Sequence, residues 1–187
     1  MNTSKMMERI IGVVTLKPAV YKAIAEDPAA TTEAWIIFAV VTAVTAFIGG
    51  IGTNVIWPVV IGLILGAIAL FFTAWVLAKV AGMLGGKTDT AEMLRISGYV
   101  SVFGIVGVLN ILALISPALL CLTTPISLAV LVLRIIGFVI GVREAAEFST
   151  TNAIITAVVA AIVNFIIVTL IGGAIIAALV GAASSVH

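Results

Sequence analysis

Residues 34–78 read AWIIFAVVTAVTAFIGGIGTNVIWPVVIGLILGAIALFFTAWVLA, 45 residues without a charged side chain. A helix needs about 20 apolar residues to cross roughly 30 Å of hydrocarbon, so this stretch is too long for one crossing. It breaks at Gly49-Gly50-Ile51-Gly52-Thr53-Asn54, where glycines permit a turn, and the following Trp57-Pro58 suits a helix start at a membrane interface. The stretch therefore predicts two transmembrane helices, over 34–50 and 57–79.

Two further uncharged blocks follow, over 96–133 and 148–187. The first breaks at Ser116-Pro117 and predicts one helix on each side of that turn. The second has no strong internal turn except at its Gly-Gly pair, and it predicts one tilted or kinked helix. These three transmembrane helices are expected over 96–115, 119–142 and 152–181. A short tail, 183–187, follows.

The composition requires lipid as the main solvent. Apolar residues make up 63% of the 187 positions and charged residues 9%, against about 45–50% and about 25% in soluble domains. A water-soluble chain of this size could not cover so much apolar surface. The net charge of +1 offers no field for nucleic acid. We therefore expect an all-α polytopic bundle of five transmembrane helices.

The basic residues predict the orientation of the chain. All nine Lys and Arg residues precede the first span, lie near the connection between the second and third, or lie toward the connection between the fourth and fifth. The positive-inside rule therefore places the N-terminus and these two connections in the cytoplasm. With five spans the C-terminus lies outside, which predicts a multi-pass protein of the cell (inner) membrane.

Residues 1–33 predict short N-terminal helices at the cytoplasmic interface. Over residues 4–14, apolar side chains recur at near-helical spacing against Lys5, Glu8 and Arg9. That pattern is typical of a short amphipathic helix lying in the headgroup region, as an anchor or as a docking site for a partner. A second short helix is expected to start at Pro18.

One charged side chain and two amide side chains lie well inside the predicted spans. Arg134 is expected to reach toward the interface, to pair with a glutamate (Glu33, Glu92 or Glu144), or to bind an anion such as a lipid phosphate. Asn110 and Asn164 lie near mid-membrane and require hydrogen-bond partners, which we expect across helices. Small residues at a spacing of four fit close helix packing, within the chain or in a homo-oligomer, unless they face lipid by coincidence. They are Gly62 and Gly66, Gly137 and Gly141, and Gly173, Ala177 and Gly181.

The sequence offers few side chains that are suited to classical catalysis. The single histidine is residue 187, and the single cysteine, Cys121, has no histidine near it in sequence. No metal-ligand spacing and no cofactor motif is present, so we expect a protein without catalytic, metal or cofactor residues.

Three stretches carry a family resemblance. They are Leu16–Trp35, Gly85–Tyr99 with its Leu-Arg-x-x-Gly-Tyr element, and Leu131–Ala153 with its Val-Arg-Glu-Ala element. From about Leu16 to about Leu170 the chain resembles the Yip1 domain family, which implies five spans and a cytoplasmic N-terminus. Phe103 stands where prokaryote-type members often have a proline, and the fourth span lacks their tryptophan near Leu133.

The resemblance is to the short prokaryote-type members. The eukaryotic branch is associated with Rab-type GTPases, but this chain lacks that branch's longer N-terminal region and its Asp-Leu-Tyr-Gly-Pro signature. Binding of a GTPase is therefore not implied.

Together, these observations predict a non-enzymatic scaffold, adaptor or membrane-organising protein. Its expected partners are membrane lipids, a protein on the cytoplasmic face and a second copy of itself. The alternatives are a lipid-binding protein and a small-solute or ion channel or carrier, the latter lined by Asn110, Arg134, Asn164 and the hydroxyls of Thr42, Thr45 and Thr73. We expect the structurally or functionally sensitive positions to be Leu94, Arg95, Gly98, Tyr99, Asn110, Arg134, Arg143, Glu144 and Asn164.

Overall fold

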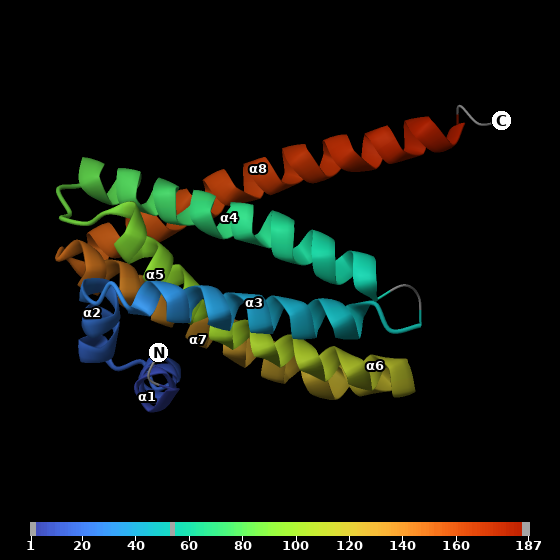
Figure 1. Ribbon diagram of the computed structural model, residues 1–187, viewed down its shortest axis with the longest axis horizontal. Helices are drawn as coiled ribbons and strands as arrows, with labels where there is room; N and C mark the ends of the chain where they lie inside the picture. The colour runs from blue at the N-terminus through green and yellow to red at the C-terminus, as the bar shows by residue number, and fades with distance from the viewer. Residues whose placement is uncertain (1–2, 53–54, 185–187) are drawn as a thin grey trace.

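The computed structural model describes residues 3–52 and 55–184, with side chains throughout except at positions 113, 114, 117, 167, 168 and 170–184. The described chain is all-α (Figure 1), which confirms the predicted class. The elements in chain order are α1 (Thr3–Val14), α2 (Pro18–Glu26), α3 (Ala30–Gly49), α4 (Ile56–Met83), α5 (Thr90–Val100), η1 (Ser101–Asn110), α6 (Ile111–Ile115), η2 (Pro117–Leu119), α7 (Leu120–Ala146) and α8 (Thr150–Ser184).

Four helical segments within the described residues are long and apolar enough to cross a bilayer. They are Ala30–Gly49, Ile56–Met83, Thr90–Asn110 and Leu120–Ala146, and they coincide with the first four predicted spans. A fifth apolar helical stretch, Thr150–Ile166, belongs to α8. Helix α8 continues unbroken to Ser184 and diverges from the other long helices toward its C-terminal end (Figure 1).

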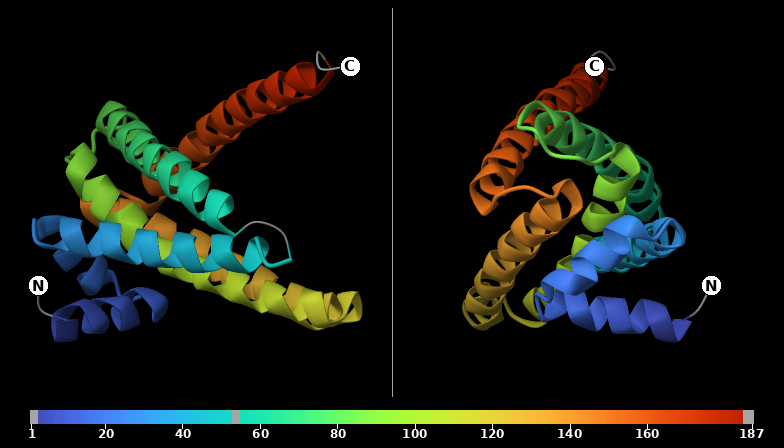
Figure 2. Two further views of the ribbon diagram at one scale, coloured as in Figure 1. Left: turned by 45° about the vertical axis from the view of Figure 1, so that its right-hand side comes forward. Right: turned by 90° about the vertical axis from the view of Figure 1, so that its left-hand side faces the viewer.

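The short helices lie at one end of this arrangement. In Figure 1, α3 and α7 run along the length of the molecule, whereas α1 is seen end-on. Figure 2 shows α1 lying across the direction of the long helices. The chain therefore begins with a helix set at a large angle to the spans.

Helix ends at the loop 84–89 follow local sequence rules. Gly85 has φ +85° after α4, and Gly86 N donates to Ala81 O at 2.9 Å, the hydrogen bond of a glycine-terminated helix. Helix α5 then begins with a capping box, in which Asp89 Oδ1 accepts from Glu92 N at 2.8 Å. The third span consequently starts as a helix at Thr90, six residues before the predicted 96.

The second half of the third span is a 3₁₀ helix, which the sequence pattern did not predict. η1 covers ten residues. With three residues per turn, a 3₁₀ helix stacks every third side chain on one face. Gly104 and Gly107 share that face, and Cβ atoms added there would lie 3.0 Å from Val41 and 3.1 Å from Thr45 of α3. The tighter winding therefore keeps a line of small residues against α3.

Glycines also allow close packing within the chain elsewhere. A Cβ at Gly66 would lie 2.7 Å from the ring of Phe38, and one at Gly137 would lie 2.6 Å from the Tyr21 hydroxyl. The predicted intramolecular role of the Gly62/Gly66 and Gly137/Gly141 pairs is thereby confirmed. The corresponding prediction for Gly173, Ala177 and Gly181 lies outside the described side chains.

We expect Gly98→Ala to destabilise the bundle. Its Cβ would lie 2.6 Å from Ala34 Cβ and 2.9 Å from Ala34 O, so two transmembrane helices must separate. Overpacking of this kind costs about 1–3 kcal/mol. The measurement is the unfolding temperature of purified protein in mild detergent.

Gly82→Ala is the matched control for this substitution. No atom lies within 4 Å of a Cβ at Gly82, so the same chemical change should be neutral or stabilising by about 0.4–1 kcal/mol. Equal unfolding temperatures for the two variants would contradict the packing argument.

Candidate functional site

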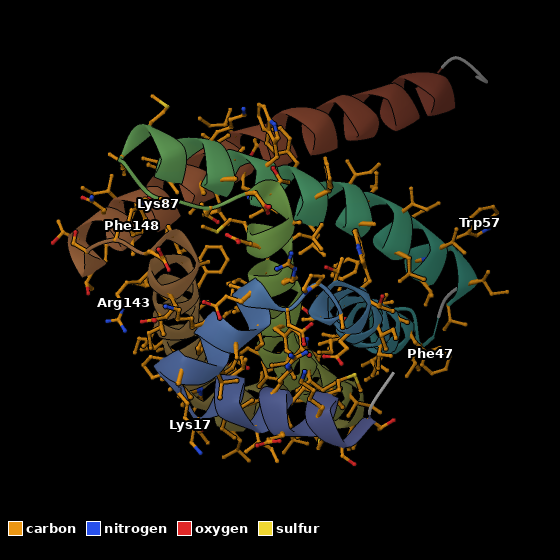
Figure 3. All side chains as sticks on the ribbon, turned by 60° about the vertical axis from the view of Figure 1, so that its left-hand side comes forward. Lys17, Phe47, Trp57, Lys87, Arg143 and Phe148 are labelled. Atoms are coloured by element: carbon orange, nitrogen blue, oxygen red, sulfur yellow. The ribbon has the colours of Figure 1, made fainter. Side chains whose placement is uncertain are left out.

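Three segments that are far apart in sequence meet at one end of the molecule. We call this region the charged end; it comprises residues 3–29, 82–95 and 143–152. Figure 3 shows Lys17, Lys87, Arg143 and Phe148 on one side of the molecule, and Phe47 and Trp57 on the other.

Specific hydrogen bonds hold these segments together. Lys87 N donates to Ala146 O at 2.9 Å, so the loop after α4 is bound to the end of α7. Asn152 Nδ2 donates to Leu84 O at 3.3 Å and ties the start of α8 to the same loop. The charged end is therefore one composite surface.

A buried ion pair connects α1 to the first span. Arg9 and Glu33 are 5% and 3% exposed, and Arg9 Nη1 lies 2.8 Å from Glu33 Oε2. The other terminal nitrogen of Arg9 bonds to Asp27, in the α2–α3 turn. One guanidinium thus bridges two carboxylates, the geometry for which arginine is better suited than lysine.

Two of the predicted sensitive residues on α5 complete this network. The Tyr99 hydroxyl, fully buried, donates to the same Glu33 carboxylate. Arg95 donates to Ala25 O near the C-terminus of α2, and its Nε donates to Thr31 Oγ1 at 3.1 Å. A cation is favourable there because the last carbonyls of a helix carry partial negative charge and lack helical partners.

We refer to Arg9, Asp27, Glu33, Arg95 and Tyr99 as the buried polar network. Removing charges from water costs several kcal/mol per ion unless partners satisfy them. Here each carboxylate receives an arginine, and Glu33 also receives the tyrosine hydroxyl. The network therefore fixes α1 and α2 on the spans only while its members remain together.

Asp27 is held in its charged form. Hydrogen bonds from Lys5 and then from Arg9 and the Ala29 amide lower the pKa of its carboxyl well below the usual range. Lys5 Nζ lies 2.8 Å from Asp27 Oδ2. The carboxylate thus receives donors from α1 and from its own turn.

The remaining predicted residues of the charged end have simpler surroundings. Leu94 is buried in the core, and Gly98 packs against Ala34. Arg143 Nη2 bonds to Glu144 Oε1 at 2.6 Å. Arg143 Nη1 donates to Thr150 Oγ1 at 3.4 Å, which links the end of α7 to the start of α8.

The polar residues of the spans do not converge on one place. Asn164 Nδ2 donates to Thr73 Oγ1 at 2.6 Å, which confirms the predicted hydrogen bond across helices. Asn110 and Arg134 lie on exposed surfaces of η1 and α7. Thr45, also considered as a lining residue, returns its hydroxyl to Val41 O in its own helix at 2.8 Å.

The predicted pairing of Arg134 with a glutamate is wrong. Glu33 is bonded to Arg9 and Tyr99, and Glu144 is bonded to Arg143. Among the side chains that the structure describes, Arg134 forms no ion pair. Arg9 lies 2.8 Å from Glu33 and Arg143 lies 2.6 Å from Glu144, so these cations bind the carboxylates instead of Arg134.

The expectation that Arg9 lies on the polar, solvated face of the first helix is wrong. Arg9, Gly12 and Val13 form the buried face of α1. A useful signal was available: Glu33 directly precedes the 45-residue uncharged block, and a carboxylate at such a place needs a cation. Which cation supplies it depends on the tertiary arrangement.

The described part of the chain contains no cluster of metal-ligating side chains. Its His, Cys, Asp and Glu side chains form no group of three or more that could hold a metal ion. Cys121 is exposed.

A known protein family matches most of the chain. The family model described as Yip1 domain matches residues 11–183. No curated protein and no solved structure is significantly similar to the chain.

We expect Arg9→Ala to destabilise the protein by about 3–5 kcal/mol, because a buried carboxylate loses its cation. The paired variant Arg9→Met with Glu33→Leu should recover most of this loss. A double-mutant cycle of unfolding in detergent measures the coupling, and hydrogen exchange over residues 3–14 reports detachment of α1.

Lys22→Ala is the control for the loss of a positive charge. Lys22 and Glu147 are about half exposed and 3.6 Å apart, so this pair should contribute less than about 1 kcal/mol. A loss for Arg9→Ala as small as that for Lys22→Ala would show that the buried pair is not a main support of the fold.

The depressed pKa of Asp27 predicts a loss of stability in acid. Because its pKa is lower in the folded state, the unfolded chain takes up the proton first as the pH falls below about 4. Stabilisation by Asp27 is therefore complete above that pH and declines below it. The difference in unfolding temperature between the natural protein and Asp27→Asn should shrink from pH 6 to pH 3. A constant difference would contradict this assignment.

Proposed function

The chain belongs to the Yip1 domain family of multi-pass membrane proteins, and from that membership we propose that it is a non-enzymatic scaffold or adaptor. Its charged end would lie in the cytoplasm and bind a protein partner. The charged end would be the binding surface, and the spans would hold it at the membrane.

The joining of three distant segments into one surface is the observation that carries this proposal. Main-chain and side-chain hydrogen bonds connect the segment after α4 to the segment after α7. The segment before the first span is joined to them by the hydrogen bond from Arg95 to Ala25 O and by the ion pair of Lys22 with Glu147. A surface fixed before binding loses less conformational entropy when a partner docks. The buried polar network supplies that rigidity for α1 and α2.

The surface also offers mixed charge and concave shape. An open groove between α1 and α2 is lined by both signs of charge, including Lys5, Glu8 and Glu26. A second groove is lined by Lys22, Arg143, Glu144, Glu147 and Phe148. Neighbouring positive and negative groups favour a partner of complementary pattern over a simple polyanion.

The cytoplasmic assignment rests on the distribution of basic residues. Lys17, Lys87 and Arg143 occur on the same side of the molecule (Figure 3), although Lys17 lies between α1 and α2, Lys87 between α4 and α5, and Arg143 in the last turn of α7. Under the positive-inside rule such an end is retained in the cytoplasm.

A channel or carrier receives less support from the arrangement. Asn164 and Thr73 are bonded to each other between α4 and α8. Asn110 and Arg134, the other expected lining groups, lie on exposed surfaces. A polar pathway would need these groups to face a common space.

The test is purification of the tagged full-length chain from its native membrane in mild detergent. We expect a reproducible protein partner, and we expect Lys22→Glu combined with Lys87→Glu to reduce its recovery several-fold. Both side chains are exposed at the charged end, so the fold should tolerate the change.

Ile115→Ala is the control, because Ile115 is 75% exposed at the opposite end of the third span. Its recovery of partner should equal that of the natural protein. Equal recovery with the double charge variant, or no reproducible partner, would contradict the adaptor proposal.

A further inference from the structure

Helix α1 has an apolar face that no part of the described chain covers. Met7, Ile11 and Val14 are 51%, 54% and 44% exposed, and their spacing of four and three residues places them in one stripe. The stripe lies away from the buried face formed by Arg9, Gly12 and Val13. Helix α1 is therefore apolar on two sides.

Contacts with α7 give the position of α1 along the length of the spans. The Tyr21 hydroxyl donates to Val13 O at 3.0 Å, at the end of α1. The same hydroxyl and Leu16 lie against Gly137 of α7. Gly137 precedes Arg143 by six residues, which is about 9 Å along a helix. The C-terminal end of α1 thus lies beside α7, about 9 Å along that helix from Arg143 and toward the middle of the span.

The direction of α1 fits the plane of a membrane. Figure 1 shows the helix end-on while α3 and α7 run lengthwise, and Figure 2 shows it lying across them. A helix in this position is parallel to the bilayer surface when the long helices cross it.

We propose that the Met7–Ile11–Val14 face of α1 inserts into the leaflet on the charged side, at the boundary between headgroups and acyl chains. An apolar helix face buried about 5–10 Å in that region is the usual arrangement for an interfacial helix. The occupant of the stripe is thus phospholipid, and the buried polar network holds the helix at the correct depth.

This interaction is independent of the adaptor function. An in-plane helix bound to lipid orients the charged end relative to the membrane whether or not a protein docks on that end. Its test can therefore succeed or fail without deciding the proposed function.

The experiment uses the full-length chain with Cys121→Ser, which removes its only cysteine. A single cysteine is introduced at Ile11, Glu8 or Val40 and labelled with an environment-sensitive fluorophore. Each protein is reconstituted in vesicles of phosphatidylcholine and phosphatidylglycerol. Spin labels near the acyl carbonyl or near the chain end quench the dye from lipid, and iodide quenches it from water.

At Ile11 we expect several-fold stronger quenching by the shallow spin label than by the deep one, and weak quenching by iodide. Glu8, on the exposed polar side of α1, should show the reverse preference for iodide. Val40, exposed in the middle of α3, should be quenched most by the deep label. Cooperative unfolding of each labelled protein shows that the fold is retained.

Equal iodide quenching at Ile11 and Glu8 would overturn the proposal, because the stripe would then face water. Quenching at Ile11 by neither lipid label nor iodide would also overturn it, since protein would then cover the stripe. A dye signal that changes when the protein is diluted with lipid would identify that cover as a second copy.

Discussion

The ion pair between Arg9 and Glu33 is the contact on which the arrangement of the charged end depends. A carboxylate at the start of an apolar span is costly unless a cation reaches it. The cation comes from a helix 24 residues earlier, so satisfying one charge brings the chain's first helix onto the spans. Tyr99 and Asp27 then bond to the same two side chains and set their geometry. Because the buried Glu33 carboxylate needs a cation, α1 is held in its position at the charged end.

The same requirement links the fold to the proposed activity. An adaptor at a membrane needs a surface that keeps its shape while the surrounding lipid is fluid. Packing among apolar helices provides little specificity of orientation, because lipid tails are as apolar as the side chains. Directional hydrogen bonds at the charged end, such as the one from Lys87 N to Ala146 O, supply this specificity of orientation. The polar contacts are concentrated where the segments that carry charge meet.

The sequence predicted the features that depend on local composition. Uncharged blocks located the spans, the Gly49–Asn54 and Ser116-Pro117 breaks separated them, and Arg95 and Tyr99 were singled out through family resemblance. The pairing of Arg9 with Glu33 was missed, because residues 4–14 are apolar on two sides and their periodicity does not say which side packs. The pairing considered for Arg134 failed for a related reason, because the fold gives each of the three candidate glutamates another partner. Glu33 binds Arg9, the Glu92 carboxylate accepts from the Asp89 amide, and Glu144 binds Arg143.

The 3₁₀ segment of the third span has a geometric consequence. Ten residues wound at about 2.0 Å each cover about 20 Å, where an α-helix would cover about 15 Å. Each residue also turns the chain by one third of a circle, so Gly104 and Gly107 lie one above the other against α3. Losing or gaining one residue in η1 would rotate everything after it by a third of a turn. Substitutions at the outward-facing positions of η1 should therefore be tolerated, whereas insertions and deletions should not. The positions that do not tolerate substitution should recur every third residue.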